Sequence, residues 1–275
     1  GDPVSGDVVA EWKNLSFDPD SINYIARVIG DQYTYFNFDA DENRQRLVTE
    51  GNYPIRNKKC DEVNFQRSME SPLSLENNNE VDIYTTTKNA FINQEVVFFG
   101  GFANTMYSKH MPSRLKKKLE SSPDFDVLSL EPLTTCTIVE ERLNEQGINN
   151  TSIVKHEGVG EIIAPHYEIL VGRDTIAFVY EPLGCHSYNV INVNGQNFKI
   201  ATIDTMLSFY LAFIYADRPY YDADRLLCMS QYLFKVQQKN RLKQKGLLRR
   251  FSISCYGEQT TLESMRQEKS DKFEE

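Results

Sequence analysis

The best candidates for chemistry in this sequence are two aspartates and a pair of glycines, which lie between two short apolar runs. Asp124 and Asp126 flank Phe125 at the start of a segment that continues as Val127-Leu128. Side chains alternate between the two faces of a β-strand, so both carboxylates are expected on the same side. Their mutual repulsion would be offset by a bound divalent metal, and oxygen ligands suit Mg²⁺. A solvated strand end is the alternative explanation of this pattern.

A pair of glycines precedes the aspartates. Gly100 and Gly101 follow the apolar run 95–99, which is typical of a buried strand, and a segment with helical character begins after them. Without side chains, the glycines would let the backbone approach a phosphate closely. This order of elements resembles that of polymerase-β-like nucleotidyltransferases. In those enzymes a strand, a Gly-Gly pair, a helix and a D-x-D motif on the next strand together hold a metal-bound triphosphate.

A nucleotidyltransferase also needs a third carboxylate, which helps to position the attacking 3′-hydroxyl group and its metal. Segments 166–171 and 175–181 flank a Gly-Arg-Asp turn, a pattern that predicts a β-hairpin. Glu168 and Glu181 are the candidates on these strands, and we favour Glu181. The acid usually lies in the middle of the second strand, where residues 177–179 read Ala-Phe-Val.

The composition of the chain restricts the classes of protein to which these motifs can belong. The chain has 275 residues and a formal net charge of −9, which argues against a protein that coats nucleic acid but allows a local basic groove. The most apolar window, 200–216, contains Asp204 and is short for a bilayer span, so we expect no membrane association. Five cysteines without a C-x-x-C pair predict free thiols in a reducing compartment and no structural zinc. They are Cys60, Cys136, Cys185, Cys228 and Cys255.

Helical patterns and basic residues dominate the last third of the chain. Residues 198–216 predict an apolar core helix, and residues 222–236 predict a second helix, adding to those expected at 81–93 and 135–145. Residues 235–250 contain seven basic residues and no acidic one, which indicates either contact with RNA phosphates or a solvated helix face. The RNA-binding candidates are Lys235, Lys239, Arg241, Lys243 and Lys245. A second basic cluster comprises Arg114, Lys116, Lys117 and Lys118.

Longer stretches resemble a known enzyme family. In order, they read VDIYTTTKNAFINQEVVFFGGFANTMYSKHMP, PDFDVLS, YEPLGCHSYN, KIATIDTMLSFYLAF and RRFSISCYGEQTTLE. Together they resemble the catalytic poly(A) polymerase of nucleo-cytoplasmic large DNA viruses, the giant-virus type, from about residue 80 to residue 275. Family members are longer, which predicts that an N-terminal portion and a C-terminal domain are missing here.

The resemblance implies template-independent addition of AMP from ATP to an RNA 3′ end, with Mg²⁺ or Mn²⁺. By motif, it assigns Gly100 and Gly101 to the nucleotide, and Asp124 and Asp126 to the metal and catalysis. Lys199 and a helix over residues 200–207 would border the nucleotide site. It also implies a viral protein of the virion or the host cytoplasm. A further alternative is a nucleotidyltransferase fold without activity that acts as an RNA-binding or dimer partner, and we expect a homodimer as one form of assembly.

The first part of the chain has a different character. The segments WKNLSFDPDSINYIARVIGD and ENRQRLVTEGNYPIRN resemble a stretch of contractile-tail sheath proteins of tailed phages, over residues 1–57. This resemblance implies an alternative function as a structural virion protein without catalysis.

The expected architecture is therefore α+β. A small β-rich, sheath-like segment (1–60) and a polar linker (61–80) would precede a polymerase-β-like nucleotidyltransferase core (81–195). A helical nucleotide- and RNA-binding part (196–275) would complete the chain.

Overall fold

The computed structural model describes most of the chain from residue 77 onward. The described residues are 60, 62–63, 77–113, 115, 119, 124–160, 162–216, 218, 221–250, 252–258, 261, 263–264, 266–267 and 270–271. The sheath-like segment 1–57 and the basic cluster at Arg114 and 116–118 lie outside them, so the predictions made for those residues stay untested.

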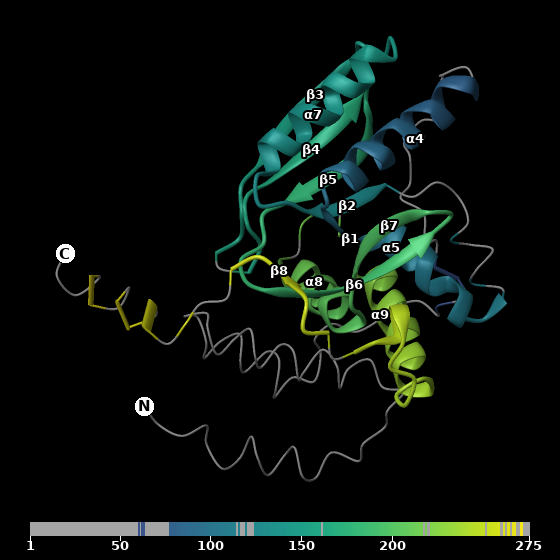
Figure 1. The fold of residues 1–275 in the computed structure, drawn as a ribbon, viewed down its shortest axis with the longest axis vertical. Helices are drawn as coiled ribbons and strands as arrows, with labels where there is room; N and C mark the ends of the chain where they lie inside the picture. The colour runs from purple at the N-terminus through teal and green to yellow at the C-terminus, as the bar shows by residue number, and fades with distance from the viewer. Residues whose placement is uncertain are drawn as a thin grey trace.

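Along the described residues, single strands and helices are followed by five consecutive strands, β3 to β7, and then by two consecutive helices, α8 and α9 (Figure 1). The helices are α4 (Asn77–Asn93), α5 (Gly100–Tyr107), α7 (Pro132–Glu145), α8 (Ile203–Ala216) and α9 (Ala223–Lys239), with 3-10 turns η1 (Ser108–His110) and η2 (Gly246–Leu248). The strands are β1 (Val97–Phe99), β2 (Phe125–Leu128), β3 (Thr151–His156), β4 (His166–Val171), β5 (Asp174–Tyr180), β6 (His186–Val193), β7 (Gln196–Ala201) and β8 (Cys255–Tyr256). The helices expected over 81–93, 135–145 and 222–236 are confirmed, as is the hairpin β4–β5.

The strands form one mixed sheet in the order β3-β4-β5-β2-β1-β7-β6-β8. Strand β2 is antiparallel to β1 and parallel to β5, and β1 is also parallel to β7. The two strands that carry the glycine and aspartate motifs are therefore neighbours in the middle of the sheet. The expected α+β class is confirmed for this part of the chain.

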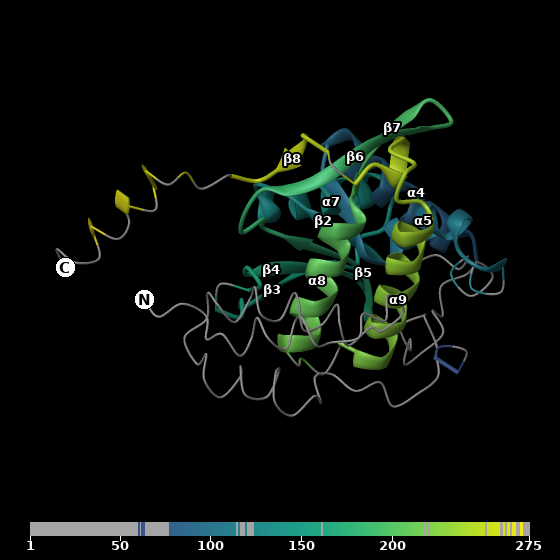
Figure 2. The ribbon, with the colours of Figure 1, turned by 90° about the horizontal axis from the view of Figure 1, so that it is seen from below.

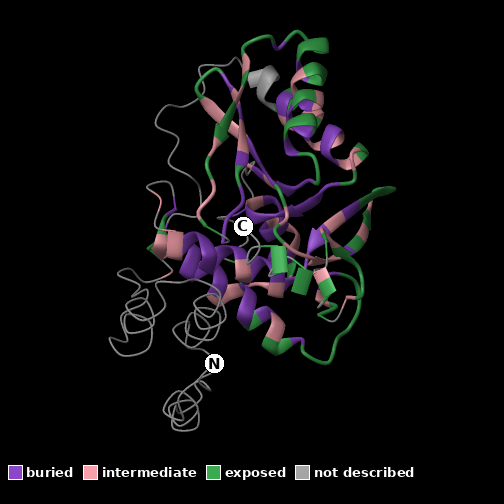
Figure 3. Cartoon of the chain, turned by 90° about the vertical axis from the view of Figure 1, so that its left-hand side faces the viewer, coloured by how far each residue is buried: buried purple, intermediate pink, exposed green. Residues whose placement is uncertain are grey.

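Aromatic side chains attach helices to both faces of the sheet. On one face, Tyr84 and Phe91 of α4 pack on Phe125 of β2, with ring centroids 4.8 and 5.8 Å apart. On the other face, Phe209 of α8 stacks on Phe99 of β1 at 4.5 Å. Figure 2 shows α8 and α9 along one side of the sheet, and Figure 3 shows the buried residues concentrated between the sheet and the helices. Since Asp126 alternates with Phe125, its side chain belongs to the α8 face.

The single helix predicted over residues 198–216 is wrong in its first part. Residues 196–201 are strand β7, and helix α8 begins at Ile203. Both pieces are apolar, and periodicity alone separates a short buried strand poorly from a buried helix. Residues 196–201 adopt the strand conformation because β7 pairs with both β6 and β1. Consequently, the predicted boundary between the nucleotidyltransferase core and the helical part, at residues 195 and 196, falls at the turn between β6 and β7 of the same sheet.

No helix in the described part of the chain has both the length and the apolar character needed to cross a membrane.

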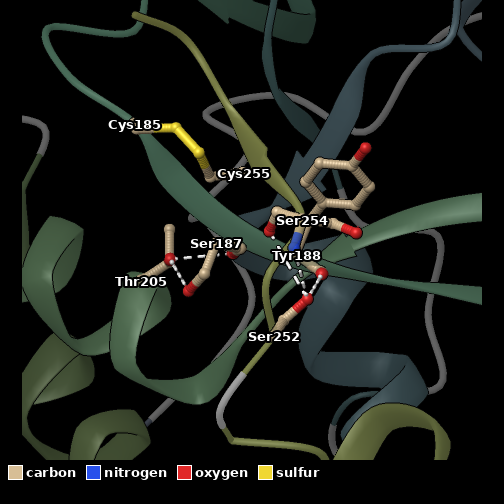
Figure 4. Close-up of a disulfide and its surroundings, with 7 residues drawn as sticks. All are labelled: Cys185, Ser187, Tyr188, Thr205, Ser252, Ser254 and Cys255. Carbon is tan, nitrogen blue, oxygen red and sulfur yellow. Dashed lines mark hydrogen bonds between the residues drawn. A yellow bond between two sulfur atoms is a disulfide. The ribbon is translucent and has the colours of Figure 1, made fainter. Parts of the chain in front are cut away.

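Four of the five cysteines form disulfides, so the prediction of free thiols is wrong for them. Cys185 is bonded to Cys255, with a Cα–Cα distance of 5.2 Å, and Cys60 is bonded to Cys228 at 5.4 Å. Cys136 remains a free, buried thiol. Figure 4 shows how the first bridge lies beside the short β6–β8 pairing, where Ser252 donates a hydrogen bond to the carbonyl oxygen of Tyr188. These partners lie 70 and 168 residues apart, so only the folded chain brings them together.

Candidate active site

The glycine pair and one aspartate meet where β1 ends and α5 begins. Phe99, the last residue of β1, lies opposite Asp126 of β2, and Gly100 has a φ of +59°, in the left-handed region that favours glycine. A β-carbon at residue 100 would overlap the Asp126 carboxylate. The Gly101 N–H points at Asp126 Oδ2, 3.4 Å away. The backbone of the glycine pair therefore lies directly against the carboxylate.

The two aspartates fit the metal that the motif implies. Asp124 directly precedes β2 and Asp126 lies within it, and both are half-buried. In the described part of the chain, no three His, Cys, Asp or Glu side chains gather as a metal site. Mg²⁺ in nucleotide-handling proteins is commonly held by one or two carboxylates, with phosphate oxygens and water completing its shell. Two carboxylates beside a glycine turn match that pattern.

A buried polar pair, absent from the sequence prediction, supports the site. Asn104 lies one helical turn after Gly100, and its Nδ2 donates a hydrogen bond of 2.5 Å to the hydroxyl oxygen of Tyr210 on α8. Burial, and then the negative charge of Asp126, raise the pKa of Tyr210, so its hydroxyl stays protonated near that carboxylate. The Asn104 Oδ1 atom is buried without a hydrogen-bond partner among the described residues. In the sequence, the spacing of four residues between Gly100 and Asn104 could have indicated that Asn104 belongs to the site. Nothing comparable singles out Tyr210, which lies within an apolar helix.

The positions beside Asp126 on β5 hold no acidic residue. Phe178 pairs with Asp126, and its neighbours on the same face are Ile176 and Tyr180. Glu181 is exposed and follows the last residue of β5. Glu168 pairs with Phe178 from the next strand, and its carboxylate contacts His156 Nε2 at 2.7 Å. The structure thus places neither glutamate next to Asp126, and the identity of the third carboxylate stays a prediction.

Lys199 does not lie at the glycine end of β1. It pairs with Val97, two residues before Phe99, and its Nζ atom contacts Glu95 Oε2 at 2.8 Å. Glu95 precedes the strand, whereas Gly100 and Gly101 follow it. The ammonium group is therefore directed away from the glycine pair, and its assignment to the nucleotide stays a prediction.

The predicted RNA-binding residues lie at the end of α9 and just after it. All are exposed, on α9 or in the turn that follows it: Lys235, Lys239, Arg241, Lys243 and Lys245. Burial, and then the positive charges of Lys109 and Lys243, lower the pKa of His110. The 3-10 turn η1 and the turn after α9 thus contribute to one positively charged region.

Comparisons with known proteins bear on the fold. No protein-family model matches the sequence, and no curated protein matches it. Nothing in these comparisons supports the resemblance of residues 1–57 to tail-sheath proteins. A similar solved structure is the crystal structure of the Megavirus polyadenylate synthase, with a TM-score of 0.58 and 16% sequence identity. The match covers 93% of this chain and 53% of that one, so this chain spans about half the length of the viral protein, to which it is similar in fold.

Proposed function

We propose that the chain is a metal-dependent nucleotidyltransferase that adds AMP from ATP to the 3′ end of RNA without a template. The observation that carries the proposal is the left-handed Gly100 directly against Asp126, at the start of a helix. The similarity in fold to the Megavirus polyadenylate synthase supports the choice of ATP and RNA as substrates. We place this viral activity in the virion or the host cytoplasm, with a homodimer as one form of assembly.

Each part of the site has a separate task in this proposal. Asp124 and Asp126 would hold Mg²⁺ or Mn²⁺, which, when bound, neutralises phosphate charge and lowers the pKa of the attacking hydroxyl. The Gly100 and Gly101 backbone, which carries no side chains of its own, receives the triphosphate beside Asp126. Asn104 and Tyr210 hold the floor of the site beside Asp126.

Substrate contacts complete the proposal. Lys199 borders the nucleotide, and Glu181 assists the 3′-hydroxyl as the third carboxylate. The exposed residues Lys235, Lys239, Arg241, Lys243 and Lys245 attract the RNA backbone, because phosphate contacts by Lys and Arg supply much of nucleic-acid affinity.

Asp126→Asn is the sharpest test, because it removes charge while keeping the shape of the side chain. We expect AMP transfer to a short labelled RNA, in ATP with Mg²⁺ or Mn²⁺, to fall about a hundredfold or more on a denaturing gel. Asp82→Asn is the matched control, since Asp82 is exposed on α4, and it should extend RNA like the unmodified chain. Unchanged transfer by a folded Asp126→Asn protein would refute the proposal.

A further inference from the structure

A small pocket lined by arginines lies between the start of α8 and the end of α9. Its polar lining includes Arg241, Gln244, Arg249 and Arg250, and its apolar lining includes Ile203 and Leu247. Arg249 and Arg250 belong to the basic stretch 235–250 but not to the five residues named as RNA-binding candidates. The pocket is a concave feature within the basic region rather than a stretch of solvated surface.

The segment that carries the arginines is held in place by hydrogen bonds. Asn189 of β6 donates from Nδ2 to the carbonyl oxygen of Arg249 at 2.8 Å. The Arg250 N–H donates to Gln244 Oε1 at 3.0 Å, and Leu247 is buried beneath the 3-10 turn η2. The guanidinium groups therefore project from a fixed backbone, which lowers the entropic cost of binding a ligand.

The charges in the pocket are unevenly compensated. Arg250 Nε lies 3.3 Å from Asp204 Oδ2, and Gln237 Nε2 donates to the other oxygen of Asp204 at 3.1 Å. Among the described residues, the guanidinium groups of Arg241 and Arg249 have no hydrogen bond or ion pair. The pocket thus combines two arginines without a counter-charge and one arginine that is paired with an aspartate. Such a group of cations favours an anion, and a guanidinium group matches the geometry of phosphate oxygens.

The size of the pocket decides which part of a nucleotide enters it. The cavity volume is about 10 Å³, which is close to the minimum that holds one water molecule. A phosphate oxygen fits such a space, whereas a nucleobase does not. The chemistry recognised is therefore a phosphate group, read by the arginines at the rim.

The position of the pocket is compatible with RNA as the source of that phosphate. Asp204, beside the pocket, and Tyr210, beside Asp126, are separated by about 9 Å along the axis of α8. An RNA strand with its 3′ end at Asp126 can continue past this distance and place a backbone phosphate at the pocket.

We propose that this arginine pocket binds a backbone phosphate of RNA upstream of the 3′ end, and that Asp204 weakens this binding by competing for Arg250. The inference rests on the proposed function for the choice of RNA as ligand. It adds Arg249 and Arg250 to the RNA contacts and gives Asp204 a regulatory part in affinity.

Binding of a fluorescein-labelled oligoadenylate of twelve nucleotides, followed by anisotropy in EDTA, tests the pocket without any need for catalysis. We expect Arg241→Gln and Arg249→Gln each to weaken binding about tenfold, as for the loss of a charged hydrogen bond. Each should also reduce the slope of log K against log salt by about 0.7. Asp204→Asn should tighten binding about two- to fivefold, because it removes a carboxylate that competes with phosphate for Arg250.

Arg142→Gln is the matched control, since Arg142 is an exposed arginine of α7 that pairs with Glu145, and it should bind RNA like the unmodified chain. Wild-type affinity and salt slope in both pocket variants would overturn the proposal, and so would weaker binding in Asp204→Asn. If saturating ATP abolishes the difference between Arg249→Gln and the unmodified chain, the phosphate belongs to the nucleotide and the assignment to RNA is refuted. Loss of RNA affinity in a chain that transfers no AMP would uphold the pocket while refuting the proposed activity.

Discussion

A β-carbon at residue 100 would overlap the carboxylate of Asp126, because the left-handed turn after β1 brings the two together. Two separate costs follow for Gly100→Ala. The left-handed backbone disfavours any L side chain by about 1–2 kcal/mol, and the contact pushes the carboxylate out of place. We expect AMP transfer to fall about a hundredfold or more, measured by the same RNA extension assay.

Gly195→Ala separates these two costs. Gly195 has a φ of +84° in the β6–β7 turn, and a β-carbon there would meet nothing within 4 Å. It should therefore show a similar backbone penalty in thermal unfolding but keep its activity. If both variants lose activity equally, the effect of Gly100→Ala is loss of stability rather than displacement of Asp126.

At the scale of elements, strand β8 is attached to the sheet by a short pairing and a covalent link. His186 and Ser187 of β6 pair with Tyr256 and Cys255, and the Cys185–Cys255 bridge lies beside this pairing. Tyr256 also reaches across the sheet, since its hydroxyl oxygen accepts from the Leu130 N–H at 3.4 Å. The disulfide thus joins the C-terminal segment to the core.

Counting thiols tests both disulfides directly. In denaturant without reductant, a thiol reagent should react with one cysteine per chain, because Cys136 is the free thiol in the structure. Mass spectrometry of non-reduced peptides should find Cys185 joined to Cys255 and Cys60 joined to Cys228. Five reactive thiols in freshly isolated protein would instead restore the expectation drawn from cysteine spacing.

At the scale of the whole molecule, buried histidines make stability depend on pH. His166 is 2% exposed, and its ring stacks between His156 and Tyr180. Burial lowers the pKa of His166 and of His186. Below the ordinary histidine pKa of about 6.5, the unfolded chain therefore binds protons that the folded chain does not. Stability contributed by neutral histidines is complete above that pH and is lost as the pH falls.

We accordingly expect the free energy of unfolding in urea to be lower at pH 5.5 than at pH 7.5. A single histidine contributes about 1 kcal/mol to such a difference. His166→Phe keeps an aromatic ring in the stack and removes the titrating group, so its unfolding free energy should change less over this range. An unaltered pH dependence in this variant would exclude His166 as a source.

Local spacing was sufficient to predict the elements that carry the glycine and aspartate motifs. The apolar run before Gly100, the D-x-D motif and the hairpin that ends at Tyr180 were predicted from residues adjacent in sequence. Each depends on strand alternation or on the backbone freedom of glycine, which neighbouring residues determine.

Tertiary structure alone decided the remainder, because it depends on contacts between distant residues. Residues 198–201 are strand rather than helix because β1 and β6 offer hydrogen-bonding edges on both sides. Asn104 and Tyr210 are 106 residues apart, and an apolar helix gives no sign that its tyrosine lies beside Asp126. The arginine pocket likewise forms only when the end of α9 folds against Ile203 of α8. Sequence spacing placed the candidate catalytic groups on their strands, while long-range packing decided which other side chains surround them.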